Sequence, residues 1–120
     1  MGITLNHTIV PARDKYASAR FLAHLFGLEV EEMGHFAAVR INDALTLDYD
    51  DRENFESHHY AFQVGNEDFD AIFTRLKGAG LSYAADPFHR NIGQINTRKG
   101  GRGFYFLDPN GHNFEVLTRA

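Results

Sequence analysis

The chain has 120 residues, of which 43% are hydrophobic and 23% are charged, with a formal net charge of −4. This composition is typical of one compact globular domain and argues against a disordered chain. The negative charge and the lack of a nucleic-acid motif argue against nucleic-acid binding, which depends on Lys and Arg neutralising phosphates. Because the chain has no cysteine, any transition metal would need His and carboxylate ligands.

Hydropathy along the chain predicts no association with membranes. No apolar run approaches the roughly 20 residues needed to span a bilayer. The opening MGITLNHTIV also lacks the basic region and the apolar core of a secretory signal. We therefore expect a cytoplasmic protein.

The first half reads as a strand, a helix and three strands. LNHTIV (5–10) predicts a strand, and a helix should follow over 15–26, with Asp14 as its N-cap and Gly27 at its end. Three short strands are expected over 28–34, 35–41 and 44–50. The acidic stretch 50–57 is most simply a solvated linker.

The second half has the same order. HHYAFQV (58–64) predicts a strand, and a helix should follow because its apolar residues stand at i, i+3, i+4 and i+7: Phe69, Ile72, Phe73 and Leu76. Asn66 or Asp68 could cap this helix, and Gly78 or Gly80 could close it. Strands are expected over 81–87, 103–108 and 112–118. Unless the repeat is a coincidence, it predicts an α+β fold of two βαβββ modules, at about 1–57 and 58–120.

The stretch YFLDPNGHNFEVLT places a carboxylate in an apolar strand. The turn residues Asp108-Pro109-Asn110-Gly111 predict a hairpin between its flanking strands. Alternation puts Phe114 and Val116 on one face and Glu115 on the other. A carboxylate in such a strand needs water, a cation or a metal.

Two histidines stand at matching positions of the repeat. In the 58–64 strand, His59 points away from the more apolar face and His58 points the other way, while His7 holds the same place in the first half. Two imidazoles and a carboxylate from three strands can hold a metal and leave positions open for substrate or oxygen, as Fe(II) prefers and as Mn, Ni, Co or Zn allow. Taken singly, His7 could be a hydrogen-bonded strand residue, His59 a rim residue, and Glu115 the partner of an arginine.

With these residues, the chain resembles the vicinal oxygen chelate superfamily, which includes glyoxalase I, extradiol dioxygenases, fosfomycin-resistance enzymes and bleomycin-resistance proteins. The resemblance rests on LNHTIV, HHYAFQV, the helix exit GAGL and the terminal GRGFYFLDPNGHNFEVL. It implies a single domain over 1–120, whose two modules form a curled mixed sheet around a metal-binding cleft. It also implies one divalent metal per chain, held by His7, His59 and Glu115, with Fe(II) the first expectation.

The resemblance further implies a metal-dependent enzyme acting on a small oxygenated substrate. Glyoxalase I usually has a fourth ligand where this chain has Thr46, so the ligand set is more similar to that of extradiol dioxygenases, whose active-site tyrosine corresponds to Tyr105. Against that class, the chain lacks their upstream acid–base histidine and has two modules where they usually have four. The alternatives are a lyase or isomerase, a fosfomycin-resistance-type transferase, although those often have Thr where Ile9 stands, and a metal-free bleomycin-binding protein.

The sequence also offers candidates for the substrate contacts and for the general base. The glycine-rich stretch 86–103 contains Arg90, Arg98, Lys99 and Arg102 and is either a lid for an anionic substrate or a solvated loop. We expect Arg102 and Thr46 to contact the substrate, and the general base could be His35, Asp48 or His89. Because family members often pair modules across subunits, the resemblance also implies a homodimer, with ligands from one chain or from both.

Overall fold

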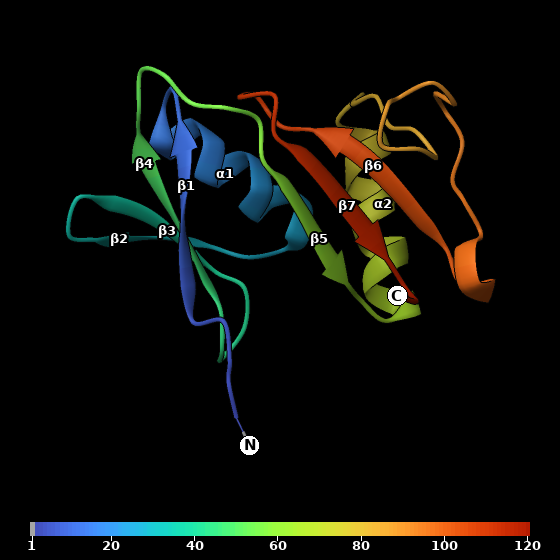
Figure 1. Cartoon of the computed structure of the whole chain (residues 1–120), viewed down its shortest axis with the longest axis horizontal. Coiled ribbons are helices and arrows are strands. Elements are labelled where there is room, and N and C mark those ends of the chain that lie inside the picture. Colours follow the sequence, from blue (N-terminus) through green and yellow to red (C-terminus); the bar gives the residue numbers. More distant parts are fainter. Residues whose placement is uncertain (1) are drawn as a thin grey trace. The chain divides into compact units, whose positions relative to one another are not determined.

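The chain forms two compact α+β units. A computed structural model describes residues 2–120, in which the first unit ends at Glu56 and the second runs from Ser57 to Ala120. Each unit contains one mixed sheet and one long helix (Figure 1). The α+β class predicted from the sequence is therefore confirmed.

The first unit is a four-stranded sheet in the order β1-β4-β3-β2. Its elements follow the predicted sequence of strand, helix and three strands: β1 (His7–Ala12), α1 (Lys15–Phe26), β2 (Val30–Met33), β3 (Phe36–Arg40) and β4 (Thr46–Asp51). β4 is parallel to β1 and antiparallel to β3. The helix lies where the sequence predicted it, because Asp14 accepts hydrogen bonds from two backbone amides of its first turn and Gly27 ends it with φ of 70°.

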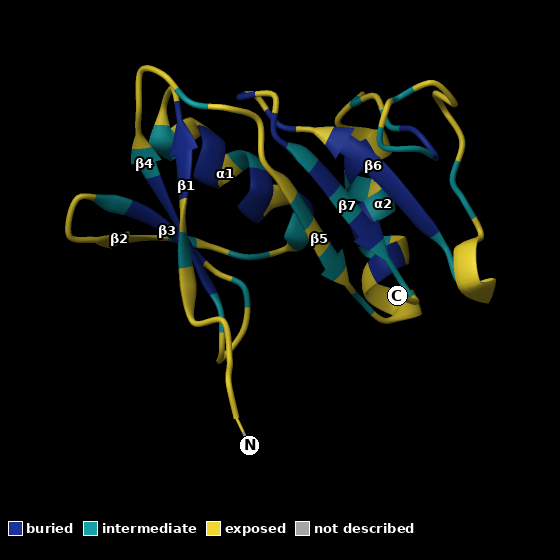
Figure 2. Ribbon diagram, in the orientation of Figure 1, coloured by how far each residue is buried: buried dark blue, intermediate teal, exposed yellow. Residues whose placement is uncertain are grey.

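Helix α1 covers one face of this sheet. The opposite face, which no described helix of this unit covers, is its open face. Leu22 and Leu25 of the helix are buried, as are Leu47 and Tyr49 of β4. The neighbouring strand β3 alternates in step, since Val39 lies opposite Leu47 and Ala37 opposite Tyr49. Burial of each large side chain stabilises the unit by roughly 1.5–3 kcal/mol. In Figure 2 the buried residues of α1 and of its sheet are dark blue along the ribbon.

The second unit is a three-stranded sheet in the order β5-β7-β6, with an aromatic core. Its elements are β5 (His59–Gln63), α2 (Asn66–Gly78), the short 3-10 helix η1 (Arg98–Gly100), β6 (Gly103–Leu107) and β7 (Asn113–Leu117). Phe69 of α2 packs edge-on against Phe104 of β6, with ring centroids 5.2 Å apart. Phe106 and Phe114 stack at 5.5 Å on the same face. The aromatic rings therefore join α2 to the sheet.

The predicted hairpin between β6 and β7 is confirmed. The strands are antiparallel, with Tyr105 opposite Glu115. In the turn, the Asp108 carboxylate accepts hydrogen bonds from the backbone amides of Asn110 and His112 at 2.9 and 2.8 Å, and Gly111 has φ of 85°. Phe114 and Val116 are buried, whereas Glu115 is only partly covered, as alternation predicted.

The strand expected over 81–87 is wrong. Only Ala84 forms isolated bridges there, to Tyr105 and to Ile92. Pro87 cannot donate a ladder hydrogen bond. The Asp86 carboxylate turns the chain by accepting hydrogen bonds from the amides of Arg90 and Asn91 at 2.9 and 2.8 Å. The second sheet therefore has one strand fewer than the first.

The ends of α2 differ in part from expectation. Gly65, not Asn66 or Asp68, is the N-cap residue, and it provides no side-chain cap. At the other end, Gly80 adopts φ of 70° and the backbone amide of Leu81 donates a hydrogen bond to the carbonyl of Leu76 at 3.2 Å, so the expected closure by a glycine is confirmed there.

Among the described residues, no helix is long and apolar enough to cross a bilayer.

Candidate functional site

The open faces of the two sheets carry equivalent pairs of residues. In the first sheet His7 lies opposite Thr46, and two residues further on Ile9 lies opposite Asp48. In the second sheet His59 lies opposite Asn113, and Ala61 lies opposite Glu115. Counted from each histidine, Asp48 holds the place that Glu115 holds. The assignment of Thr46 to this carboxylate position is therefore corrected by two residues.

His59 and Glu115 come together on the open face of the second sheet. His59 Nε2 lies 3.1 Å from Glu115 Oε1, and the two residues belong to the neighbouring parallel strands β5 and β7. The carboxylate side chain is 15% exposed and the imidazole is 48% exposed. A nitrogen and an oxygen donor at this separation are two ligands that divalent transition metals accept.

Tyr105 of β6 completes this face beside the pair. Its ring centroid is 5.8 Å from that of His59, and its residue is only 3% exposed. Burial is the main cause that raises the pKa of Tyr105, and a hydrogen bond from Arg98 opposes it. The charge of Glu115 and a hydrogen bond to its carboxylate raise the pKa of Tyr105 further. Because the resulting pKa lies above the ordinary value of about 10, the phenol is protonated at neutral pH and can donate a hydrogen bond.

Arg98 is the partner of Tyr105, which the sequence did not reveal. Its Nη1 donates to the Tyr105 hydroxyl at 2.7 Å, and its guanidinium carbon lies 5.6 Å from the centre of the tyrosine ring. Arg98 belongs to η1 in the glycine-rich stretch, and the only signal for it was the cationic character of that stretch. Loop conformation, rather than any periodic pattern, brings the two side chains together.

Arg102, expected to contact the substrate, is held by α2. Its Nη1 donates to Asp70 at 2.8 Å, its Nη2 donates to the Asn66 side chain at 3.0 Å, and its guanidinium lies 4.3 Å from the Phe69 ring centre. It also lines a small cavity of about 120 Å³, together with Arg98, Lys99 and Glu115. A role for Arg102 with an anionic substrate stays a prediction.

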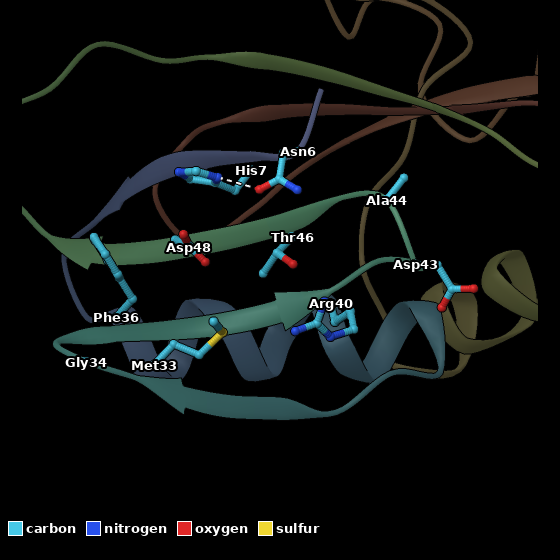
Figure 3. Close-up of a pocket in the computed structure, with 10 residues that line it drawn as sticks. All are labelled: Asn6, His7, Met33, Gly34, Phe36, Arg40, Asp43, Ala44, Thr46 and Asp48. Carbon is cyan, nitrogen blue, oxygen red and sulfur yellow. Dashed lines mark hydrogen bonds between the residues drawn. The ribbon is translucent and has the colours of Figure 1, made fainter. Parts of the chain in front are cut away.

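The open face of the first sheet carries a larger cavity, of about 530 Å³ (Figure 3). Ten residues line it, and all belong to the first unit: Asn6, His7, Met33, Gly34, Phe36, Arg40, Asp43, Ala44, Thr46 and Asp48. His7 Nδ1 lies 2.8 Å from the Asn6 side-chain oxygen. The expected substrate contact Thr46 thus shares a cavity with the expected ligand His7.

The candidate ligands are divided between the units. His59 and Glu115 form a pair in the second, and His7 lies on β1 of the first. Within residues 2–120, no three His, Asp or Glu side chains form a group that could hold a metal ion. The three-residue ligand set therefore stays a prediction, of which the second unit supplies a formed pair.

The candidate bases are also separated. His35 is exposed and lies 3.7 Å from Asp50, and His89 Nε2 lies 2.9 Å from the Asn113 side-chain oxygen. Asp48 is the candidate that lines the large cavity.

A family model described as Glyoxalase/Bleomycin resistance protein/Dioxygenase superfamily matches residues 4–116. The chain belongs to this superfamily. The solved structure of Oxidase ChaP-H2 is 56% identical, with a TM-score of 0.95, and the match covers 100% of this chain and 96% of that one. Oxidase ChaP-H1 is 47% identical, also with a TM-score of 0.95, over 99% of this chain and 98% of that one.

A curated relative is Glutathione transferase FosA of Serratia marcescens, which is 31% identical over 94% of this chain and 79% of its own length. The superfamily thus includes relatives named for different reactions, oxidation and transfer. This membership confirms the resemblance inferred from the sequence. It does not specify which of these reactions the chain catalyses.

Proposed function

We propose that this superfamily member is a metal-dependent oxidase acting on a small oxygenated molecule. The observation that carries the proposal is the His59–Glu115 pair, 3.1 Å apart on an open sheet face. Full-length similarity to two proteins named oxidases supports the reaction type. His7 is the proposed third ligand, and one divalent ion per chain is expected, with Fe(II) ahead of Mn, Ni, Co and Zn.

The donor set fits such an ion. An imidazole nitrogen and a carboxylate oxygen suit borderline divalent metals, and the pair is partly exposed, so an ion and a substrate can reach it. When bound, the metal would act as a Lewis acid towards neighbouring substrate oxygens. A cation would also compensate the charge of Glu115 in its apolar strand. The sequence analysis predicted that this carboxylate needs such a partner.

The chain's own side chains would orient the substrate. Tyr105, protonated at neutral pH, can donate a hydrogen bond to a substrate oxygen, and Arg98 fixes the direction of its hydroxyl. Thr46 offers a hydroxyl to the cavity that His7 lines. These residues position atoms and hold protons, and Tyr105 is the proposed catalytic side chain among them.

The second candidate is a fosfomycin-resistance-type transferase, favoured by the 31% identity to Glutathione transferase FosA. The two candidates differ in what is consumed. An oxidase consumes O₂, whereas a transferase consumes a thiol such as glutathione without O₂. A lyase or isomerase would consume neither, and a metal-free binding protein would turn over nothing.

We also propose that the chain is a homodimer. Four large apolar side chains of the first unit are exposed, namely the fully exposed Ile3, Leu5 at 66%, Met33 at 41% and Ile9 at 40%. Exposed apolar surface on a small protein is often covered by a partner. Sedimentation should give twice the monomer mass of 13.6 kDa, and a monomer at micromolar concentration would contradict the proposal.

The test of the proposed function is elemental analysis of untagged protein purified anaerobically without chelators. We expect about one iron per chain, lost in His59→Ala and retained in His58→Ala. His58 is the matched control because it precedes His59 and its Nδ1 lies instead 2.7 Å from the Tyr60 hydroxyl. O₂ uptake by the iron-loaded protein with catechols would follow.

Other outcomes redirect or overturn the proposal. Zinc, nickel or manganese at one per chain would favour a lyase or a transferase. Equal iron in both variants would remove His59 from the ligand set. No metal in the wild-type protein, even after reconstitution, would leave a ligand-binding protein as the better description.

A further inference from the structure

Asp48 has a buried carboxylate oxygen without a partner. The residue is only 7% exposed, and its Oδ1 has no hydrogen-bond partner among the described residues. It stands on β4, whose neighbours β1 and β3 carry Ile9 and Ala38 opposite it. Neither of these side chains can donate a hydrogen bond. A buried carboxylate in this state destabilises the folded chain, so a ligand is the expected source of the missing donor.

The carboxylate faces a cavity that can hold such a ligand. Asp48 and Thr46 come from β4 and line the 530 Å³ cavity together, as Figure 3 shows. Cavities of 300–1,000 Å³ are the usual size of small-molecule sites. The partnerless oxygen and the cavity are independent observations, and both indicate a binding site.

Comparison with Glu115 shows why Asp48 is suited to a substrate rather than to a metal. The two residues hold equivalent register positions, but Glu115 pairs with its histidine, His59, at 3.1 Å. Asp48 is one methylene shorter, so its carboxylate lies nearer the sheet. The equivalent histidine, His7, has Asn6 as its neighbour at Nδ1. The shorter side chain forms part of the cavity wall.

The other lining residues indicate the class of ligand. Met33 and Phe36 provide an apolar wall, and Thr46 provides a hydroxyl beside Asp48. Arg40 and Asp43 add one charge of each sign. An apolar wall beside a carboxylate favours a neutral molecule with an apolar body and at least one O–H donor.

We propose that Asp48 is a specificity-determining residue that accepts a hydrogen bond from a substrate hydroxyl in this cavity. The inference deepens the proposed function, because it places the hydroxylated part of the substrate in the cavity that His7 lines. It does not depend on which metal is bound. A substrate whose hydroxyl is methylated should lose this interaction.

The test measures binding to metal-free protein by titration calorimetry, with catechol and its dimethyl ether as probes. Wild-type protein should bind catechol more tightly than the ether. Asp48→Asn should weaken catechol binding about tenfold, the usual effect of losing a charged hydrogen bond, and leave the ether unchanged. Asp50→Asn is the matched control on the same face of β4, because Asp50 already pairs with Arg52 at 2.9 Å. It should not change either affinity.

Thermal unfolding separates binding from a structural role. Asp48→Asn should raise Tm by several degrees because it removes a buried charge without a partner, whereas Asp50→Asn should not raise it. A lower Tm for Asp48→Asn, no catechol binding to wild-type protein, or unchanged catechol binding to the variant would overturn the inference.

Metal content distinguishes the two proposals. Asp48→Asn should retain the metal bound by wild-type protein, and its loss would make Asp48 a metal ligand and overturn the substrate role. If wild-type protein binds no metal but shows the expected catechol preference, the proposed oxidase fails and the Asp48 site stands.

Discussion

The open faces of the two sheets share a register and differ in chemistry. In the second sheet the carboxylate, Glu115, pairs with its histidine, and a protonated tyrosine lies beside them. In the first sheet the equivalent carboxylate, Asp48, has no partner at Oδ1 within residues 2–120, and it lines a cavity. The repeat therefore places a carboxylate at equivalent positions of both sheets, Asp in the first and Glu in the second. We propose that Glu115 binds the metal and that Asp48 accepts a hydrogen bond from a substrate hydroxyl.

The second unit also replaces a strand with a loop. Where the first unit has β2 directly after its helix, the second has the turn held by Asp86, and the chain then continues to η1 with Arg98. This loop brings a guanidinium to Tyr105. The irregular segment that stands in place of a strand thus brings the cationic Arg98 to the open face of the second sheet.

The largest expected difference between the units concerns their cores. Phe114 and Leu47 each precede the open-face carboxylate of their sheet, and both are buried. Phe114→Ala should lower the free energy of unfolding by about 3–5 kcal/mol and Leu47→Ala by about 2–4 kcal/mol. The larger effect is expected at Phe114 because its ring stacks on Phe106. Urea denaturation measures both, and an equal or larger loss at Leu47 would contradict a core dominated by aromatic stacking.

The turns should differ next. Asp108 is buried and caps the β6–β7 turn, whereas the exposed Asn42 accepts amide hydrogen bonds from Ala44 and Leu45 at 2.8 and 2.9 Å. Asp108→Ala should cost about 1–3 kcal/mol because it strands buried amides, and Asn42→Ala about 0.5–1 kcal/mol because water replaces the lost acceptor. Chemical denaturation of the two variants checks the order, and a smaller cost at Asp108 would refute it.

A third comparison concerns two tyrosine hydrogen bonds. The Tyr105 hydroxyl accepts from Arg98 in a part-buried setting, whereas Tyr16 on α1 donates to Glu32 at 2.9 Å on the surface. Double-mutant cycles with Tyr105→Phe and Arg98→Met should give a coupling of about 1 kcal/mol. Tyr16→Phe with Glu32→Gln should give less than about 0.5 kcal/mol. Similar coupling energies would show that the Arg98–Tyr105 hydrogen bond is no stronger than the surface hydrogen bond between Tyr16 and Glu32.

The smallest expected effect tests the loop that replaces the strand. Backbone amides, that of Asn91 first, lower the pKa of Asp86 in the folded chain. A lowered folded pKa means that Asp86 contributes stability above its unfolded pKa of about 3.9 and loses it as pH falls through the folded value. The stability difference between wild-type protein and Asp86→Ala should therefore be present at pH 7 and shrink in acid. A difference independent of pH would remove this role.

The sequence by itself determined the local elements. Helix α1 and the β6–β7 hairpin follow from caps, turn residues and alternation, which act over a few neighbouring residues. The same alternation placed His59 and Glu115 on one kind of face, and their strands prove to be neighbours. Local patterns suffice where one strand face is clearly more apolar than the other.

Only the tertiary structure decided the register and the loop. Thr46 and Asp48 stand on the same face of β4, so alternation cannot say which of them matches Glu115, and pairing with β1 settles it. The strand predicted over 81–87 does not form because the Asp86 carboxylate accepts hydrogen bonds from backbone amides further along the chain and turns it. The contact of Arg98 with Tyr105 likewise depends on the path of an irregular segment. These features arise from contacts between residues that no local periodicity relates, which is why they emerge only in the folded chain.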